Sequence, residues 1–151
     1  MRRAFAHHGQ AFDVLIACDN AVPHLLSDAD ILDAFRAFYR CVKPGGGCLI
    51  TVRDYDREVR TGVQVKPYGI REQDGSTYLV FQVWVFEGAL YDLSMYFVRD
   101  DGGSEGVAHI FRTRYYAVSP NRLVELLQEA GFHHVRRVDG EYYQPVILGS
   151  R

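Results

Sequence analysis

Two short polar clusters, each placed directly after an apolar run, carry residue types that bind small ligands. The first contains Asp19, Asn20 and His24 after residues 12–18, and the second contains Arg53, Asp54, Tyr55 and Asp56 after residues 48–52. Open α/β sheets bind their ligands at the carboxyl ends of their strands, so both clusters are expected to face one crevice. The alternative is that Arg53 and the two aspartates form surface ion pairs, which contribute little.

A strand–helix–strand unit is predicted to position these clusters. Residues 12–18 are apolar, partly β-branched and too few for a helix, which predicts a strand buried on both faces. Ser27 with Asp30 three residues later is typical of a helix start, and apolar side chains at helical spacing follow as far as residue 42. Residues 44–47, Pro-Gly-Gly-Gly, are expected to end this helix before a second buried strand. Short connections predict that the two strands are parallel.

The second half of the chain has a different pattern. From about residue 64, strand-like runs over 76–86, 91–99 and 107–116 are separated by turn signals, which predicts an antiparallel meander rich in aromatic residues. Ser119-Pro120 then begins a final helix that ends at Gly131, and residues 133–138 and 144–148 are two further strand candidates. The predicted fold class is α/β: a partial Rossmann-like sheet with antiparallel tail strands and an inserted meander over residues 64–117.

Composition limits the functions that are expected. The 151 residues are 48% apolar and 13% aromatic, which is enough for the core of one domain. The net charge of −2 offers no attraction to nucleic acid or an anionic membrane, so neither is expected as a partner. Three cysteines without a CxxC pair predict buried thiols in a reducing, cytoplasmic setting. No metal ligand is assigned, because His7-His8 is expected in an exposed loop, and no catalytic triad is assigned either.

The order of several segments resembles the second half of a class I S-adenosylmethionine-dependent methyltransferase. These segments are residues 12–20, His24-Leu25, and Lys43-Pro44-Gly45-Gly46 with the strand that follows. Within that superfamily, further pieces are similar to the glycine N-methyltransferase family: residues 53–56, Thr61-Gly62, Phe111-Arg112 and Tyr115-Tyr116. The resemblance covers nearly the whole chain. The Lys-Pro-Gly-Gly turn is specific only to the superfamily.

The resemblance implies a function and a set of site residues. It implies S-adenosylmethionine as cofactor, and a small substrate that has an amine and a carboxylate. The cofactor contacts would be Asp19, Asn20 and His24, and the substrate contacts would be Asn20, Arg53, Tyr96, Tyr115 and Tyr116. Arg53 matches the arginine that holds the substrate carboxylate, a task that suits a planar guanidinium. The reaction would be N-methylation of a small amino acid or amine.

The departure from the family is that its glycine-rich GxGxG turn does not occur in this sequence. The chain starts where the family's fourth strand starts, so residues 1–151 are expected to form a single truncated methyltransferase-like domain. An apolar strand at a sheet edge is adhesive, and the edge at residues 12–18 is therefore expected to be covered by a second copy of the chain or by an N-terminal partner. The alternative function is a non-catalytic module, derived from a methyltransferase, that binds small carboxylates or serves in assembly.

Overall fold

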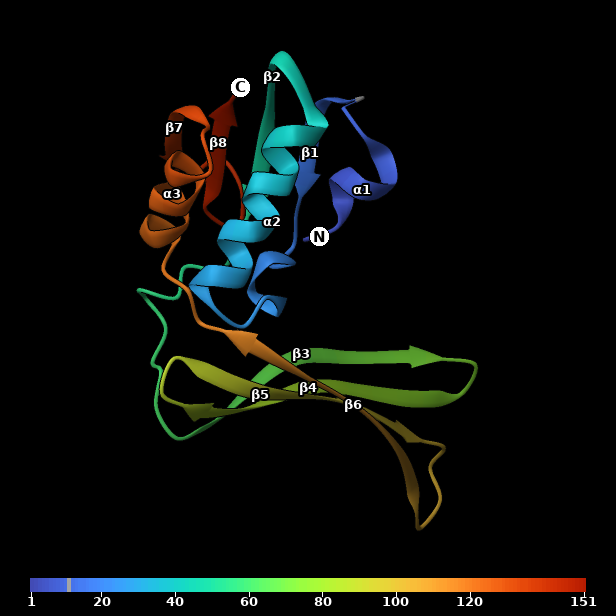
Figure 1. The fold of residues 1–151 in the computed structure, drawn as a ribbon. Helices are drawn as coiled ribbons and strands as arrows, with labels where there is room; N and C mark the ends of the chain where they lie inside the picture. Colours follow the sequence, from blue (N-terminus) through green and yellow to red (C-terminus); the bar gives the residue numbers. More distant parts are fainter. Residues whose placement is uncertain (11) are drawn as a thin grey trace. The chain divides into compact units, whose positions relative to one another are not determined.

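The computed structural model describes residues 1–10 and 12–151, which form two compact units (Figure 1). The first, called here the αβ unit, contains residues 1–59 and 116–151. The second, called the meander unit, contains residues 60–115.

The αβ unit contains a mixed four-stranded sheet in the order β1-β2-β8-β7. Its strands are β1 (Phe12–Ala17), β2 (Val42–Thr51), β7 (His133–Val138) and β8 (Val146–Ser150). β1 and β2 are parallel, whereas β8 is antiparallel to both β2 and β7. The predicted parallel pair with antiparallel tail strands is therefore confirmed.

Two amphipathic helices pack against this sheet, and Figure 1 shows both on the same side of it. α2 (Asp28–Cys41) lies between β1 and β2 in the chain, and α3 (Pro120–Glu129) precedes β7. As predicted, the hydroxyl of Ser27 caps α2 by accepting from the Asp30 N–H, and that of Ser119 caps α3 by accepting from the Asn121 N–H. The core between helices and sheet is apolar: Ile31, Phe35, Phe38, Ile50, Leu123, Leu126, Leu127 and Ile147 are all buried. The N-terminal segment adds a short helix, α1 (Ala4–His8).

The prediction that β1 is buried on both faces is wrong. Val14 is 59% exposed and Ile16 is 64% exposed, while Ala17 on the opposite face of the strand is buried. The physical reason is that β1 is the edge strand and, among the described strands, pairs with β2 alone, while α2 packs against the sheet on the side of the buried residues. The expectation of three buried thiols is wrong in the same place, because Cys18 is exposed whereas Cys41 and Cys48 are buried. Burial raises the pKa of the Cys48 thiol to about 12.

The Pro-Gly-Gly-Gly segment lies within β2 and not between a helix and a later strand. α2 ends at Cys41 and β2 already begins at Val42. A Cβ atom on Gly46 would lie 2.3 Å from the Asp13 carbonyl oxygen, so only glycine allows β1 to approach β2 at this point. The glycines therefore serve close strand pairing.

The meander unit is an antiparallel sheet in the order β3-β4-β5-β6. Its strands are β3 (Val63–Gln73), β4 (Ser76–Glu87), β5 (Leu90–Asp100) and β6 (Gly106–Tyr116). The sequence predicted the last three. It did not predict β3, which contains Pro67 and Gly69 at a register shift, two residue types that are unfavourable in strands.

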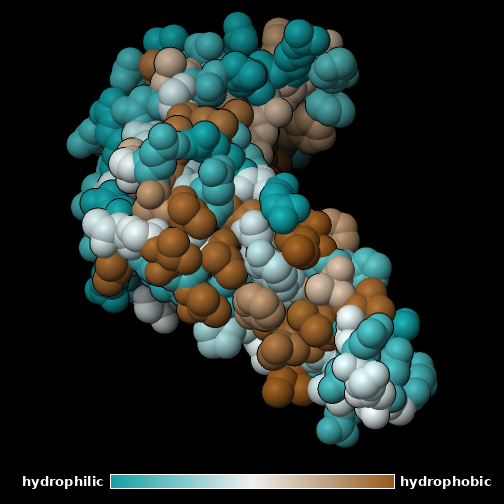
Figure 2. All heavy atoms as spheres, turned by 90° about the horizontal axis from the view of Figure 1, so that it is seen from below, coloured by the Kyte–Doolittle hydropathy of each residue, from teal (hydrophilic) through white to brown (hydrophobic). Residues whose placement is uncertain are grey.

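Aromatic side chains lie on both faces of the meander sheet. Trp84 packs on Tyr91 with ring centroids 4.8 Å apart, while Phe81 stacks on Tyr96 on the opposite face at 4.7 Å. Exposed apolar residues on the face of Phe81 are Val63, Val65, Leu79 and Val85. Figure 2, a view from below, shows apolar side chains in brown gathered next to one another.

Neither a membrane-spanning helix nor a metal-binding group is found among the described residues. No helix within residues 1–10 and 12–151 is long and apolar enough to span a membrane. In the same part of the chain, no group of three or more histidine, cysteine or acidic side chains is arranged to hold a metal ion.

Candidate ligand-binding site

The two polar clusters meet at the carboxyl ends of β1 and β2. The backbone N–H of Arg53 donates to Asn20 Oδ1 at 3.1 Å, and Asn20 Nδ2 donates to the Tyr55 hydroxyl at 2.6 Å. Parallel strands deliver their carboxyl ends to the same edge of a sheet, which is why these residues come together. The predicted adjacency of the two clusters is confirmed.

The turn after β1 has an unusual backbone. Asp19 and Asn20 both have left-handed conformations, with φ of 55° and 61°. Thr51, at the end of β2, holds this turn: its hydroxyl accepts from the Asp19 N–H at 2.8 Å, and its carbonyl accepts from the Asn20 N–H at 3.3 Å. Aspartate and asparagine tolerate this region better than most residues, but two in succession are uncommon and such strain concentrates at functional sites.

Asn20 acts mainly as the link between the two strand ends. Asn20 is buried, with an exposed fraction of 8%, and both polar atoms of its amide form hydrogen bonds to groups that follow β2. The resemblance assigns Asn20 to the cofactor and the amine. The structure shows the contacts that Asn20 makes within the chain, and its contact with a ligand stays a prediction.

Arg53 is engaged by a carboxylate of its own chain. Its Nη1 donates to Glu58 Oε1 at 3.2 Å, and the two side chains are only 31% and 18% exposed. Arg53, which the resemblance assigns to binding a substrate carboxylate, is thus in contact with the carboxylate of Glu58. Sequence reasoning missed Glu58, because nothing in the spacing of positions 53 and 58 indicates a pair.

A pocket of about 420 Å³ lies beside this pair. The residues lining it come from the segment after β2 and from the β7–β8 loop, and they include Arg53, Asp54, Arg57, Glu58, Asp139 and Tyr142. Its size is within the range of sites for small molecules. Arg137 joins the two segments: Nη2 donates to Asp54 Oδ2 at 2.6 Å, and Nε donates to Asp139 Oδ1 at 2.8 Å.

Tyr143 connects the β7–β8 loop to the end of β1. Its hydroxyl donates to Asp19 Oδ1 at 2.8 Å, and this hydrogen bond to a carboxylate raises the pKa of the Tyr143 phenol. The ring centroids of Tyr142 and Tyr143 are 4.4 Å apart, and both rings are exposed at the pocket. The sequence marked this segment only as a turn between two strands, so both tyrosines were missed.

The remaining predicted residues lie in different places. His24 is exposed at the end of a 3₁₀ turn, Val22–His24. In the αβ unit, the Tyr116 hydroxyl donates to Asp28 Oδ1 at 2.9 Å, near the start of α2. In the meander unit, Tyr115 stacks on Tyr91 at 5.4 Å.

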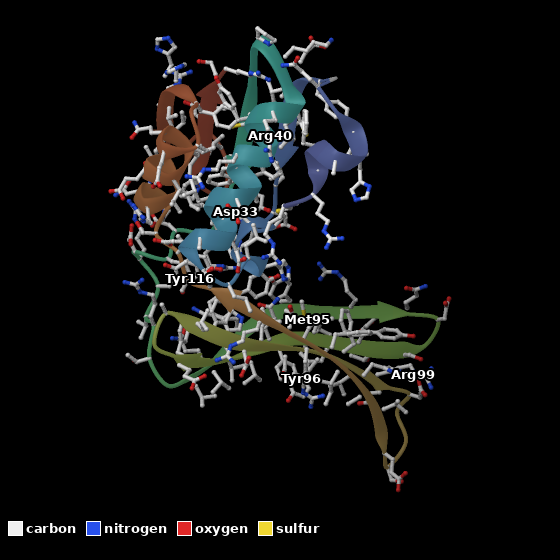
Figure 3. The ribbon with its side chains drawn as sticks, viewed as in Figure 1. Asp33, Arg40, Met95, Tyr96, Arg99 and Tyr116 are labelled. Carbon is white, nitrogen blue, oxygen red and sulfur yellow. The ribbon has the colours of Figure 1, made fainter. Side chains whose placement is uncertain are left out.

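Tyr96 does not share a face with Tyr91. Figure 3 shows that Met95, on the face of Tyr91, and Tyr96 project from opposite sides of β5. Tyr96 and Tyr115 are therefore not brought to one surface of the sheet. Their assignment to a substrate pocket stays a prediction.

Comparison with known proteins places this geometry in a structural class. The sequence matches no model of a protein family and is not detectably similar to any curated protein. Among solved structures, it is similar to SAM-bound CalS10, an amino pentose methyltransferase from Micromonospora echinaspora, with a TM-score of 0.80 and 16% identity over 95% of this chain. Streptomyces venezuelae DesVI follows with a TM-score of 0.77 and 17% identity over 94% of the chain.

A third similar structure is the sugar N-methyltransferase KedS8 from Streptoalloteichus sp. ATCC 53650, with a TM-score of 0.75 and 15% identity over 95% of this chain. The chain spans 59%, 59% and 57% of the lengths of these three proteins, respectively. Both the mixed sheet and the meander lie within the matched span, because nearly all of the chain is covered. The chain therefore has the Rossmann-like α/β fold of the class I SAM-dependent methyltransferases, over somewhat more than half of their length.

Proposed function

We propose that this chain is part of a SAM-dependent methyltransferase that methylates the amino nitrogen of a small molecule. The observation that carries the proposal is the extent of the structural likeness. A TM-score of 0.80 over 95% of the chain includes the inserted meander as well as the sheet and helices of the αβ unit. The names of CalS10 and KedS8 describe methyl transfer to amino pentoses and to sugar nitrogen, which supports an amine as the acceptor.

The residues at the end of β1 fit one side of the cofactor. Asp19 is exposed at the carboxyl end of a parallel strand, and Tyr143 orients its carboxylate, so Asp19 can accept hydrogen bonds from a polar ligand. His24 lies after the same strand. When bound, SAM supplies an activated methyl group on a sulfonium, and the chain then has only to position a neutral amine in line with it.

Asn20 and Thr51 support this site by fixing the strained turn against β2. The residues thus hold and orient the reactants, and none of them needs to act as a nucleophile. Because the glycine-rich turn is not in this sequence, the remaining polar contacts to the cofactor would come from outside residues 1–151.

We also propose that the free edge of β1 is where that further polypeptide joins. β1 pairs with β2 alone among the described strands, and it presents Val14 and Ile16 to solvent. A shallow apolar hollow of about 530 Å³, lined partly by Val14, Leu49 and Leu148, continues from the edge across the same sheet. CalS10 has 41% of its length outside the matched span, which is the kind of polypeptide that could add a neighbouring strand.

The non-catalytic carboxylate-binding module is not favoured as an alternative. Arg53, which would hold the carboxylate, already contacts Glu58. The finer likeness to the glycine N-methyltransferases also stays a prediction. The names of CalS10 and KedS8 give an amino pentose and a sugar as acceptors, and neither names an amino acid.

Calorimetric titration of the chain with S-adenosylhomocysteine tests the proposed function. We expect saturable heat in the micromolar to millimolar range, and about tenfold weaker binding for Asp19→Asn, which loses the charge of the carboxylate. Asp33→Asn is the matched control, because Asp33 is exposed on α2 and faces solvent. Absence of heat at millimolar ligand, or equal weakening by both variants, would contradict the proposal.

A further inference from the structure

We propose that Glu58 decides which acceptors the pocket beside β2 can take. By pairing with Arg53, Glu58 makes the pocket reject molecules that carry a carboxylate, and it leaves amines without a carboxylate as the accepted class. This inference rests on the proposed function, because only a methyltransferase has a methyl acceptor to select. It departs from the amino-acid substrate that the sequence resemblance implies.

The first support is the geometry of the pair. The Arg53 Nη1 to Glu58 Oε1 distance of 3.2 Å lies at the long end of the hydrogen-bond range, and both groups carry a charge. Glu58 is 18% exposed, so water screens the pair less than it would a surface ion pair. Both side chains line the pocket of about 420 Å³, which means that a ligand in the pocket would meet Arg53 together with its carboxylate.

The second support is that Glu58 competes from the same chain. It lies five positions after Arg53, so its carboxylate stays close to the guanidinium at an effective concentration of millimolar or more. A free carboxylate at lower concentration has to displace it. Displacement would also leave the Glu58 charge partly buried, which is unfavourable.

The third support is the charge of the remaining pocket wall. Asp54 and Asp139 line the pocket as well, and Asp54 is only 15% exposed. The other guanidinium of the wall, Arg57, already lies 3.4 Å from Asp54. Both arginines of the wall, Arg53 and Arg57, therefore already contact carboxylates of the chain, and an added carboxylate would have to compete with Glu58 or Asp54 for either one.

The rim of the pocket favours a different ligand. The exposed rings of Tyr142 and Tyr143 offer aromatic faces, which attract cations and the apolar surface of small molecules. Aromatic faces beside carboxylate oxygens, which accept hydrogen bonds, together suit an amine. An acceptor amine that carries no carboxylate meets both features without displacing Glu58.

Binding of acetate and glycine, followed by NMR titration of the chain without any methyl donor, tests the proposal. We expect the unmodified chain to bind either ligand only weakly, with a dissociation constant of about 100 mM or more. Glu58→Ala should gain acetate binding by about tenfold or more, and Glu58→Gln should gain less, because its amide oxygen still accepts from Arg53. The double variant Arg53→Ala/Glu58→Ala should lose the gain.

Glu129→Gln is the matched control, because it removes a negative charge from an exposed pair with Arg36 at 4.0 Å. It should gain nothing. If the unmodified chain binds acetate as well as Glu58→Ala does, or if Glu58→Gln and Glu58→Ala both gain nothing while their circular dichroism is native, the proposal is overturned. Because no cofactor is present, these results do not depend on whether the chain binds S-adenosylhomocysteine, so the two proposals can fail separately.

Discussion

Asn20 is a polar residue near the proposed ligand site whose side chain holds the backbone in place. Its amide bonds the Arg53 N–H and the Tyr55 hydroxyl, which ties the turn after β1 to the segment after β2. Since Thr51 holds the same turn from the other side, the left-handed conformations of Asp19 and Asn20 are supported by several hydrogen bonds at once. The position of Asp19 then depends on Asn20, although the two side chains point to different partners.

Asn20→Ala should lower the free energy of unfolding by about 1–3 kcal/mol, because two buried hydrogen bonds are lost. Asn20→Asp should cost less, since a carboxylate oxygen can still accept from the Arg53 N–H and from the Tyr55 hydroxyl. Urea unfolding followed by circular dichroism measures both values. Asn121→Ala serves as the control at an exposed position of α3. A loss for Asn20→Ala no larger than that of the control would contradict this account.

The pairing of β1 with β2 depends on a glycine for which the sequence pattern predicts a loop. A Cβ on Gly46 would meet the Asp13 carbonyl oxygen at 2.3 Å and Val42 Cγ1 at 2.8 Å. These contacts are closer than real Cβ atoms tolerate, so the two strands would have to separate locally. The same segment was interpreted as a helix stop, because Pro and Gly are typical of turns and a close strand approach leaves no different local pattern.

Gly46→Ala should therefore destabilise the αβ unit by about 1–3 kcal/mol, the usual range for overpacking. Gly103→Ala is the matched control, because a Cβ there meets no atom within 4 Å and the residue has no positive φ. Thermal unfolding monitored by circular dichroism compares the two variants. Equal melting temperatures would show that β1 and β2 are not held as closely as the structure indicates.

The prediction of β3 failed for a related reason. Pro67 and Gly69 interrupt its pattern, and tertiary pairing with β4 over the length of β3 overrides the weak local preference. By contrast, α2, α3 and their serine caps followed from local sequence, because capping and helical periodicity act between residues close in the chain.

For the molecule as a whole, the open edge at β1 leads to a prediction about how residues 1–151 behave in solution. An edge strand with apolar side chains tends to pair with another strand. When the proposed further polypeptide is absent, we expect the chain to self-associate through this edge at micromolar concentration. Light scattering measures the association, and Ile16→Lys should abolish it, because a charged residue on an edge strand opposes pairing.

Val59→Lys is the control for added charge, since Val59 is an exposed apolar residue, 67% exposed, outside any strand. It should leave the association unchanged. Hydrogen exchange gives an independent measurement, in which the amides of residues 14–17 should be more protected in the associated form than in Ile16→Lys. A monomer whose amides at residues 14–17 exchange freely would rule out the edge as a joining surface.

Local sequence patterns were enough to predict the two parallel strands, both main helices with their caps, three of the four meander strands and the meeting of the two polar clusters. These features depend on local periodicity and on the rule that parallel strands end at one sheet edge. Three features depend on folding: the contact of Glu58 with Arg53, the hydrogen bond from Tyr143 to Asp19 across 124 positions, and the exposure of one face of β1. Side chains that meet only through folding leave no recognisable spacing pattern in the sequence. The burial of a strand likewise depends on the elements that are its neighbours in space.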